Sequence, residues 1–151
     1  MPSTPPRWNL ANIYASVEDP RLASDMEWCQ IQTTRLEAHF QTALEPLTQQ
    51  NALPETLNPL LNQLVDDLNA LILKSGTIDA YLYGLITTDS FDKKAEQMQS
   101  RFEIARVPFQ NLFVRLRAWF GKLGQTLPTA LKAPGSAKDH AFILLEEAEQ
   151  S

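Results

Sequence analysis

Cysteine is nearly absent from this chain of 151 residues, and because Cys29 stands alone, no internal disulfide can form. Reduced thiols are typical of the cytoplasm, so the sequence predicts a cytoplasmic protein. Apolar runs are only a few residues long, whereas a membrane span needs about 20, and we therefore expect no membrane contact. Residues 1–6 have neither the charged region nor the apolar region of a signal peptide, and we expect a disordered tail there.

Positive charge is also scarce. The chain has 13 Lys and Arg residues against 18 Asp and Glu residues, which gives a formal net charge of −5. A domain that binds nucleic acid is normally basic, so this balance argues against a nucleic-acid partner. The composition is otherwise ordinary for a globular protein, with 44% apolar residues, and the length suits one domain.

Catalytic and metal-binding patterns are missing. His39 and His140 are the only histidines, and neither begins the His-Glu-x-x-His pattern of zinc peptidases. The Glu-x-x-His pattern of di-iron bundles fails too, because Leu36 and Ala137 occupy the positions that glutamate would need. One cysteine cannot build a structural zinc site. We expect no metal or other cofactor in this chain.

Two further features, a single cysteine and a pair of adjacent aspartates, could suggest a catalytic role. Cys29 lies on an apolar helical stripe, which predicts a small buried core residue, with a reactive thiol as the alternative. Asp66 and Asp67 are adjacent, and neighbouring side chains on a helix do not face each other, so they should not form a coupled acid–base pair. Aromatic residues at helical spacing are expected in the core rather than around a cofactor: Tyr81, Tyr83, Phe102, Phe109 and Trp119.

What the chain does have is helical periodicity. A first helix should begin at Asp19-Pro20, since aspartate is a good N-cap and proline suits the first helical position, and should end at Pro46. A second should begin near Pro54-Glu55. A third should begin after Asp89 or Ser90.

The third helical pattern contains Pro108, and its apolar stripe keeps phase across this proline. We therefore predict a kink there, within one helix that ends at Gly121 and Gly124. A fourth helix should begin near Ser136 and run to the end of the chain, where no capping residue stops it. The chain therefore reads as the front part of a larger protein.

These patterns predict an all-α fold, because no run of alternating β-branched residues competes. Short connections between long helices favour antiparallel neighbours. We expect an elongated antiparallel bundle of three long helices plus a C-terminal helix over residues 19–151, preceded by an irregular N-terminal arm over residues 7–18. Four arginines, Arg101, Arg106, Arg115 and Arg117, lie on the third pattern. They predict a solvated face paired with acidic neighbours or, alternatively, a docking face for an acidic partner.

The arm carries the most specific pattern in the chain, in which Trp8 and Leu10 are followed by Ile13 and Tyr14. This opening resembles that of the oligoendopeptidase F branch of the thimet-oligopeptidase-like zinc metallopeptidases. The helix entry Glu18-Asp19-Pro20 and the later parts of the chain are also similar, so the resemblance spans about residues 7–150. Burying such bulky anchors could contribute roughly 1.5–3 kcal/mol each and lay the arm across a bundle.

The resemblance implies a helical N-terminal lobe that forms one wall of a deep cleft, which admits short unfolded peptides and excludes folded proteins. The catalytic lobe, with its zinc and its His-Glu-x-x-His helix, would be absent here, so this chain alone should not cleave peptides. Its partners would be that missing lobe and, in the parent enzyme, short peptides, with self-association of the isolated lobe through exposed apolar surface. The alternative is a free-standing helical adaptor that binds a protein partner.

Overall fold

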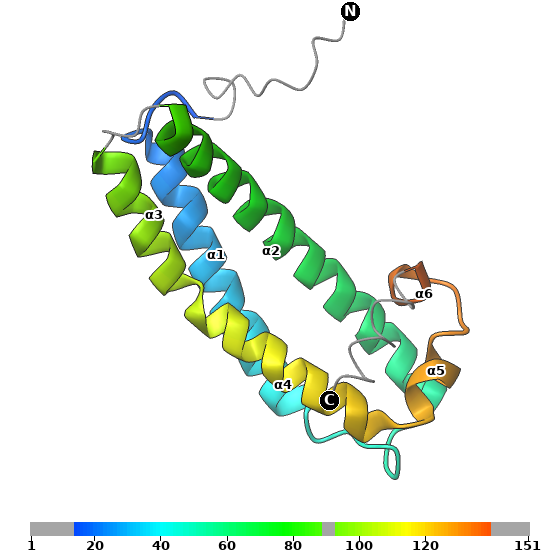
Figure 1. Ribbon diagram of the computed structural model, residues 1–151. Coiled ribbons are helices and arrows are strands. Elements are labelled where there is room, and N and C mark those ends of the chain that lie inside the picture. Colours follow the sequence, from blue (N-terminus) through cyan, green and yellow to red (C-terminus); the bar gives the residue numbers. More distant parts are fainter. Residues whose placement is uncertain (1–13, 89–92, 140–151) are drawn as a thin grey trace, which may run out of the picture. The chain divides into compact units, whose positions relative to one another are not determined.

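Helices make up most of the computed structural model, which describes residues 14–88 and 93–139 (Figure 1). Within these two ranges there is no strand, so the predicted all-α class is confirmed. The elements in chain order are α1 (Pro20–His39), the π-helix η2 (Phe40–Leu44), α2 (Pro54–Thr88), α3 (Lys93–Ala105), α4 (Val107–Leu123), α5 (Thr126–Ala130) and α6 (Ser136–Asp139).

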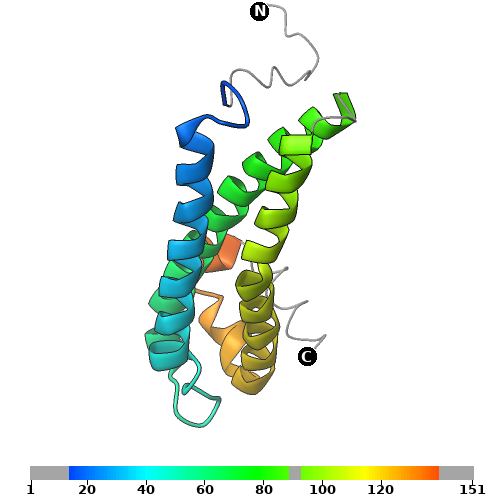
Figure 2. The ribbon, with the colours of Figure 1, turned by 90° about the vertical axis from the view of Figure 1, so that its left-hand side faces the viewer.

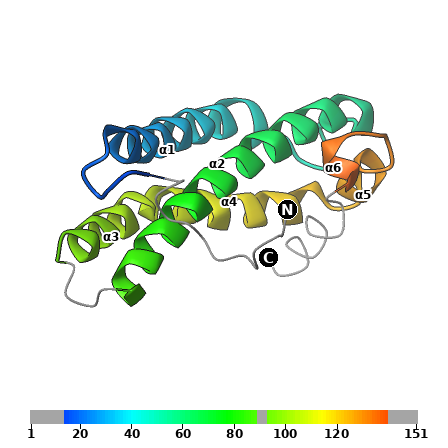
Figure 3. The ribbon, with the colours of Figure 1, turned by 90° about the horizontal axis from the view of Figure 1, so that it is seen from above.

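Two compact units share the chain. Unit 1 comprises residues 1–31 and 72–106, and unit 2 comprises residues 32–71 and 107–151. The helices α1 and α2 contribute to both units. Within unit 1, α3 lies beside the last turns of α2 (Figure 2). Within unit 2, α5 and α6 lie beside the first turns of α2 (Figure 3). The elongated arrangement of one whole bundle stays a prediction.

Helix boundaries follow the predicted capping residues in most places. Helix α1 begins at Pro20 with Asp19 as its cap, and α2 begins at Pro54. Helix α4 ends just before Gly124, which has a φ of 52° that glycine adopts without a Cβ penalty. Gly121, by contrast, lies inside α4. The predicted cap at Asp89 or Ser90 lies outside the described residues.

The prediction of one kinked helix around Pro108 is wrong. The chain forms two helices, α3 and α4, with Arg106 as the single residue between them. Proline has no N–H to donate to the carbonyl of Ile104, its ring crowds that carbonyl, and it disfavours helical geometry at Val107. The Arg106 N–H still donates to the Phe102 carbonyl at 3.0 Å, so the hydrogen-bond ladder of α3 is complete up to the break.

The first predicted helix also ends differently, because α1 passes into the π-helix η2 before Pro46 is reached. The Glu45 N–H donates to the carbonyl of Phe40, five residues back, at 2.7 Å. The wider turn brings Phe40 and Leu44 into the core of unit 2, and both are fully buried. A π-helix is rare, and nothing in the apolar spacing indicated one.

Among the residues that the structure describes, Trp119 is the largest fully buried side chain, and it organises the core of unit 2. Its ring meets Phe40 edge-on with centroids 5.7 Å apart and lies beside Phe120 at 5.6 Å. Its indole N–H donates to the Leu47 carbonyl at 2.9 Å. The tryptophan therefore ties α4 to the segment that follows η2 by both packing and a hydrogen bond.

Two asparagines of α2 hold the segment that carries α5 and α6. The Asn58 side chain donates to the carbonyl of Ala130 at 2.9 Å, and the Asn62 side-chain oxygen accepts the Ala137 N–H at 2.9 Å. Gly135 passes the Asn62 amide so closely that a Cβ would lie 2.5 Å from it. Helix α6 begins at the predicted residue, while the part of the prediction that runs it over residues 140–151 lies outside the described residues.

Gly76 offers a test of the packing in unit 1. It lies inside α2, and a Cβ placed on it would meet nothing within 4 Å. Glycine inside a helix costs about 1 kcal/mol relative to alanine, so Gly76→Ala should raise the melting temperature by about 2–4 °C. Thermal unfolding followed by circular dichroism measures this. Gly135→Ala is the matched control and should lower the melting temperature, because both its φ of 146° and the Asn62 amide oppose a side chain.

Candidate functional site

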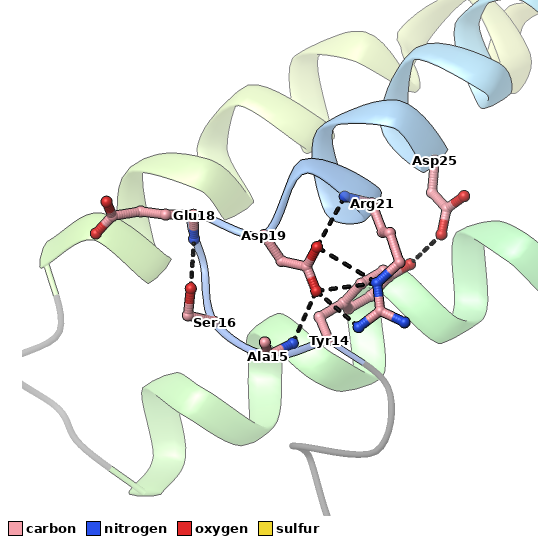
Figure 4. Close-up of polar contacts among 7 residues, drawn as sticks. All are labelled: Tyr14, Ala15, Ser16, Glu18, Asp19, Arg21 and Asp25. Carbon is pink, nitrogen blue, oxygen red and sulfur yellow. Dashed lines mark hydrogen bonds and ion pairs between the residues drawn. The ribbon is translucent and has the colours of Figure 1, made fainter.

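Tyr14 is the first residue of the arm that the structure describes, and its side chain is buried. Its hydroxyl donates a hydrogen bond of 2.6 Å to the Asp25 carboxylate on α1 (Figure 4). Its ring meets Tyr81 of α2 edge-on, with centroids 5.0 Å apart and planes at 75°. Tyr14 is therefore fixed to two helices of one unit. The other predicted anchors, Trp8, Leu10 and Ile13, lie outside the described residues.

The environment of Tyr14 keeps its hydroxyl protonated. Burial raises the pKa of Tyr14 far above its ordinary value, and the hydrogen bond to the Asp25 carboxylate raises it further. The ammonium group of Lys74 lies 3.5 Å from Asp25 and 5.9 Å from the centroid of the Trp28 ring. The Asp25 carboxylate therefore accepts one hydrogen bond from a hydroxyl and lies beside one cation.

The turn after Tyr14 is held by Asp19. One carboxylate oxygen accepts the Arg21 N–H at 2.9 Å, which caps α1, and the other accepts the Ala15 N–H at 2.8 Å (Figure 4). The Arg21 guanidinium pairs with the same carboxylate at 2.8 Å. The pKa of Asp19 lies well below its usual range. The Arg21 guanidinium makes the largest contribution to this shift, and the backbone N–H groups of Ala15 and Arg21 make the next largest. Asp19 thus closes the arm onto the start of α1.

A third contact joins the arm to α3. The Glu18 N–H donates to the Ser16 hydroxyl at 3.1 Å, and the Lys94 ammonium pairs with the Glu18 carboxylate at 2.6 Å. Both charged side chains are mostly exposed, and such pairs contribute little to stability. The pair therefore serves more to orient the turn than to hold it.

The residues around Tyr14 and Asp19 connect the turn before α1 with α1 through Asp25, with α2 through Tyr81 and with α3 through Lys94. Among residues 14–88 and 93–139, no group of three or more His, Cys, Asp or Glu side chains could hold a metal ion. Cys29 is buried, as expected, with its sulfur 3.7 Å from the Ser75 hydroxyl. Burial raises the pKa of the Cys29 thiol, which disfavours the reactive thiolate. His39 is exposed at the end of α1.

The predicted basic residues divide between the units. In unit 1, Arg106 pairs with Asp79, and Arg101 lines a shallow pocket of about 220 Å³. In unit 2, Arg115 pairs with Glu45 at 2.7 Å. The remaining arginine of the set, Arg117, is half-buried in unit 2. Arg106 and Arg115 thus meet acidic neighbours of their own unit, and the docking face stays a prediction.

One surface in unit 1 was missed from the sequence. Tyr83 was expected in the core, but it is 64% exposed, and this expectation was wrong because Tyr81 already occupies the inner side of the helix. Tyr83 borders a groove of about 390 Å³ between α2 and α3. The available signal was the spacing, since residues two apart on a helix point in nearly opposite directions. The lining residues are Asp79, Ala80, Tyr83, Gln99, Glu103 and Arg106.

Comparison with protein-family models, curated proteins and solved structures gives no match for this chain. In the described ranges, no helix combines the length and apolarity that crossing a membrane requires. The case for a peptidase relationship therefore depends on the residues of the arm and of the helices that follow it.

The loss of stability at acid pH should depend on Asp19. Because its pKa lies below that of an unfolded aspartate, its stabilising contribution is complete above about pH 4 and is lost as the pH falls further. Thermal unfolding between pH 6 and pH 2.5 should therefore show a steeper acid decline for the natural protein than for Asp19→Asn. Equal slopes for Asp19→Asn and the natural protein would contradict this assignment.

Proposed function

We propose that this chain is the N-terminal helical lobe of a zinc metallopeptidase similar to oligoendopeptidase F. In this function the lobe forms one wall of the substrate cleft and limits entry to short, unfolded peptides. The zinc ion and the His-Glu-x-x-His helix would belong to a catalytic lobe outside this sequence, and zinc there would activate water for peptide hydrolysis. The lobe by itself would not cleave peptides.

The observation that best supports this proposal is the buried position of the Tyr14 side chain. The resemblance predicts that the bulky residues of the arm clasp a helical bundle, and Tyr14, the last residue of that pattern, is buried against α2 and bonded to α1. The fold class also agrees with a helical lobe. A merely solvated tail would give no reason for a buried tyrosine at this position.

A second function, an adaptor for a protein partner, is favoured by the exposed apolar side chains. Large hydrophobic residues on the described helices are more than 45% exposed at several positions. Where such residues are contiguous, the patch that they form often marks an interface. In the peptidase proposal, some of this surface would face the catalytic lobe. The residues on α2, α3 and α4 are Ile72, Leu73, Tyr83, Ile104, Val107 and Val114.

The deciding experiment uses the full reading frame that contains this chain. We expect it to encode a His-Glu-x-x-His segment, to yield a protein with one bound zinc ion per catalytic lobe, and to cleave a quenched fluorogenic oligopeptide in a chelator-sensitive way. The variant with alanine in place of the motif glutamate is the matched control and should bind zinc without cleaving. A reading frame without the motif, or a zinc-loaded protein that leaves every oligopeptide intact, would refute the peptidase proposal and favour the adaptor.

A further inference from the structure

A pocket of about 220 Å³ in unit 1 lies between the turn before α1 and one face of α3. Lys94, Gln97 and Arg101 line it from α3, and their spacing of three and four residues places them on the same side of that helix. Glu18 and Asp19 line it from the turn (Figure 4). The wall therefore holds charges of both signs, and what the pocket can bind depends on which of them are already paired.

Both carboxylates of the wall have cationic partners. The Lys94 ammonium pairs with Glu18 at 2.6 Å, and the Arg21 guanidinium pairs with Asp19 at 2.8 Å. Arg101, by contrast, is exposed, and no ion pair of the described residues includes it. When Arg21 is counted with the wall, one positive charge is in excess, and it belongs to the guanidinium of Arg101.

The rest of the wall is apolar and consists of Val17, Ala23 and Met98. A guanidinium binds a carboxylate through two parallel hydrogen bonds, and an apolar surface beside it favours an aliphatic group. A phosphate fits less well, because it carries nearly two negative charges at neutral pH and would face two carboxylates with only one cation in excess. The pocket is also smaller than the roughly 300–1,000 Å³ of sites for drug-sized ligands, so its ligand should be small.

We propose that this pocket binds a monocarboxylate that carries a short aliphatic chain. The carboxylate would pair with the Arg101 guanidinium and accept a further hydrogen bond from the Gln97 amide. The aliphatic chain would cover Val17, Ala23 and Met98. This chemistry is shared by a free short-chain acid and by the C-terminal residue of a peptide. The inference does not depend on the proposed function, because residues of unit 1 alone line the pocket.

Nuclear magnetic resonance titration of the full chain of 151 residues tests the proposal. The probes are isocaproate, which is a free acid, and N-acetyl-leucine, which has the same aliphatic chain and presents the end of a peptide. Each is compared with its amide, which has no charge. We expect at least one of the acids to shift the backbone amides of residues 17–19 and 94–101. It should bind about fivefold more tightly than its amide, the ratio that one exposed ion pair supplies.

Three variants separate the role of Arg101 from general attraction to a basic helix. Arg101→Gln should bring the affinities of acid and amide within about twofold, and circular dichroism should show unchanged helix content because the side chain is exposed. Arg101→Lys keeps the charge but loses the fork, so it should give an intermediate ratio. Lys93→Gln removes the same charge from an exposed position of α3 outside the pocket, and it should leave the fivefold ratio unchanged.

The source of the carboxylate follows from the two acids. Tighter binding of isocaproate would identify a free acid as the ligand, and tighter binding of N-acetyl-leucine would identify the end of a peptide. Equal affinity of acids and amides, an unchanged ratio in Arg101→Gln, or an equal loss in Lys93→Gln would overturn the proposal. Tighter binding of inorganic phosphate than of both acids would refute the choice of a monocarboxylate, and no shifts with any probe would show that the pocket takes no such ligand.

Discussion

Replacing Trp119 with alanine should lower the free energy of unfolding by about 3–5 kcal/mol, the range for truncating a large buried aromatic side chain. The effect is large because Trp119 is 1% exposed, packs on Phe40 and Phe120, and donates to the Leu47 carbonyl. Since domains of this size are stable by only about 5–15 kcal/mol, the variant should unfold at a much lower urea concentration.

Two comparison variants separate packing from hydrogen bonding in this prediction. Trp119→Phe keeps most of the ring but leaves the Leu47 carbonyl without its donor, and it should cost less than the alanine variant. Trp28→Phe, at a half-buried tryptophan of α1, should cost about 1 kcal/mol or less. Urea unfolding followed by circular dichroism measures all three. A loss below about 1 kcal/mol in Trp119→Ala would show that Trp119 does not organise unit 2.

The helices themselves were largely predictable because their signals are local. Asp19-Pro20 and Pro54 mark the starts of α1 and α2, and Gly124 marks the end of α4, since capping depends on a few adjacent residues. The break at Arg106 was missed because the apolar stripe keeps its phase, and phase cannot show whether a proline bends a helix or divides it. The π-helix η2 was missed because one wider turn leaves no mark on short-range spacing.

The candidate site was less predictable, because its contacts join residues from different elements. That Tyr14 is an anchor followed from its size and its place in the arm. Its partners Asp25 and Tyr81 lie 11 and 67 positions away, and no spacing rule connects them. The same applies to Asn58 and Asn62, whose place inside a helix was the only hint that their amides bind other backbone. The helices could therefore be predicted from the sequence pattern, whereas the side-chain contacts between them could be seen only in the structure.

Tyr14→Ala should be the most damaging single change in unit 1, with an expected loss of about 3 kcal/mol of unfolding free energy. The substitution removes a buried ring that packs on Tyr81 and the donor that satisfies Asp25. Tyr14→Phe keeps the ring and should cost about 1 kcal/mol. Tyr83→Phe is the matched control, since the Tyr83 side chain is mostly exposed and its loss of a hydroxyl should change nothing measurable.

The stability of the protein at alkaline pH gives an independent test of the role of Tyr14. The folded protein raises the pKa of Tyr14 above that of an unfolded tyrosine. The contribution of Tyr14 to the free energy of unfolding is therefore complete below about pH 10, the pKa of the unfolded side chain, and is lost as the pH rises above it. Melting curves above pH 10 should therefore fall more steeply for the natural protein and for Tyr83→Phe than for Tyr14→Phe. Amide hydrogen exchange should also quicken in residues 15–25 of Tyr14→Ala, because the arm loses its buried anchor. Unchanged exchange there would mean that Asp19 and Arg21 hold the turn without Tyr14, and the anchor would then lie elsewhere in the arm.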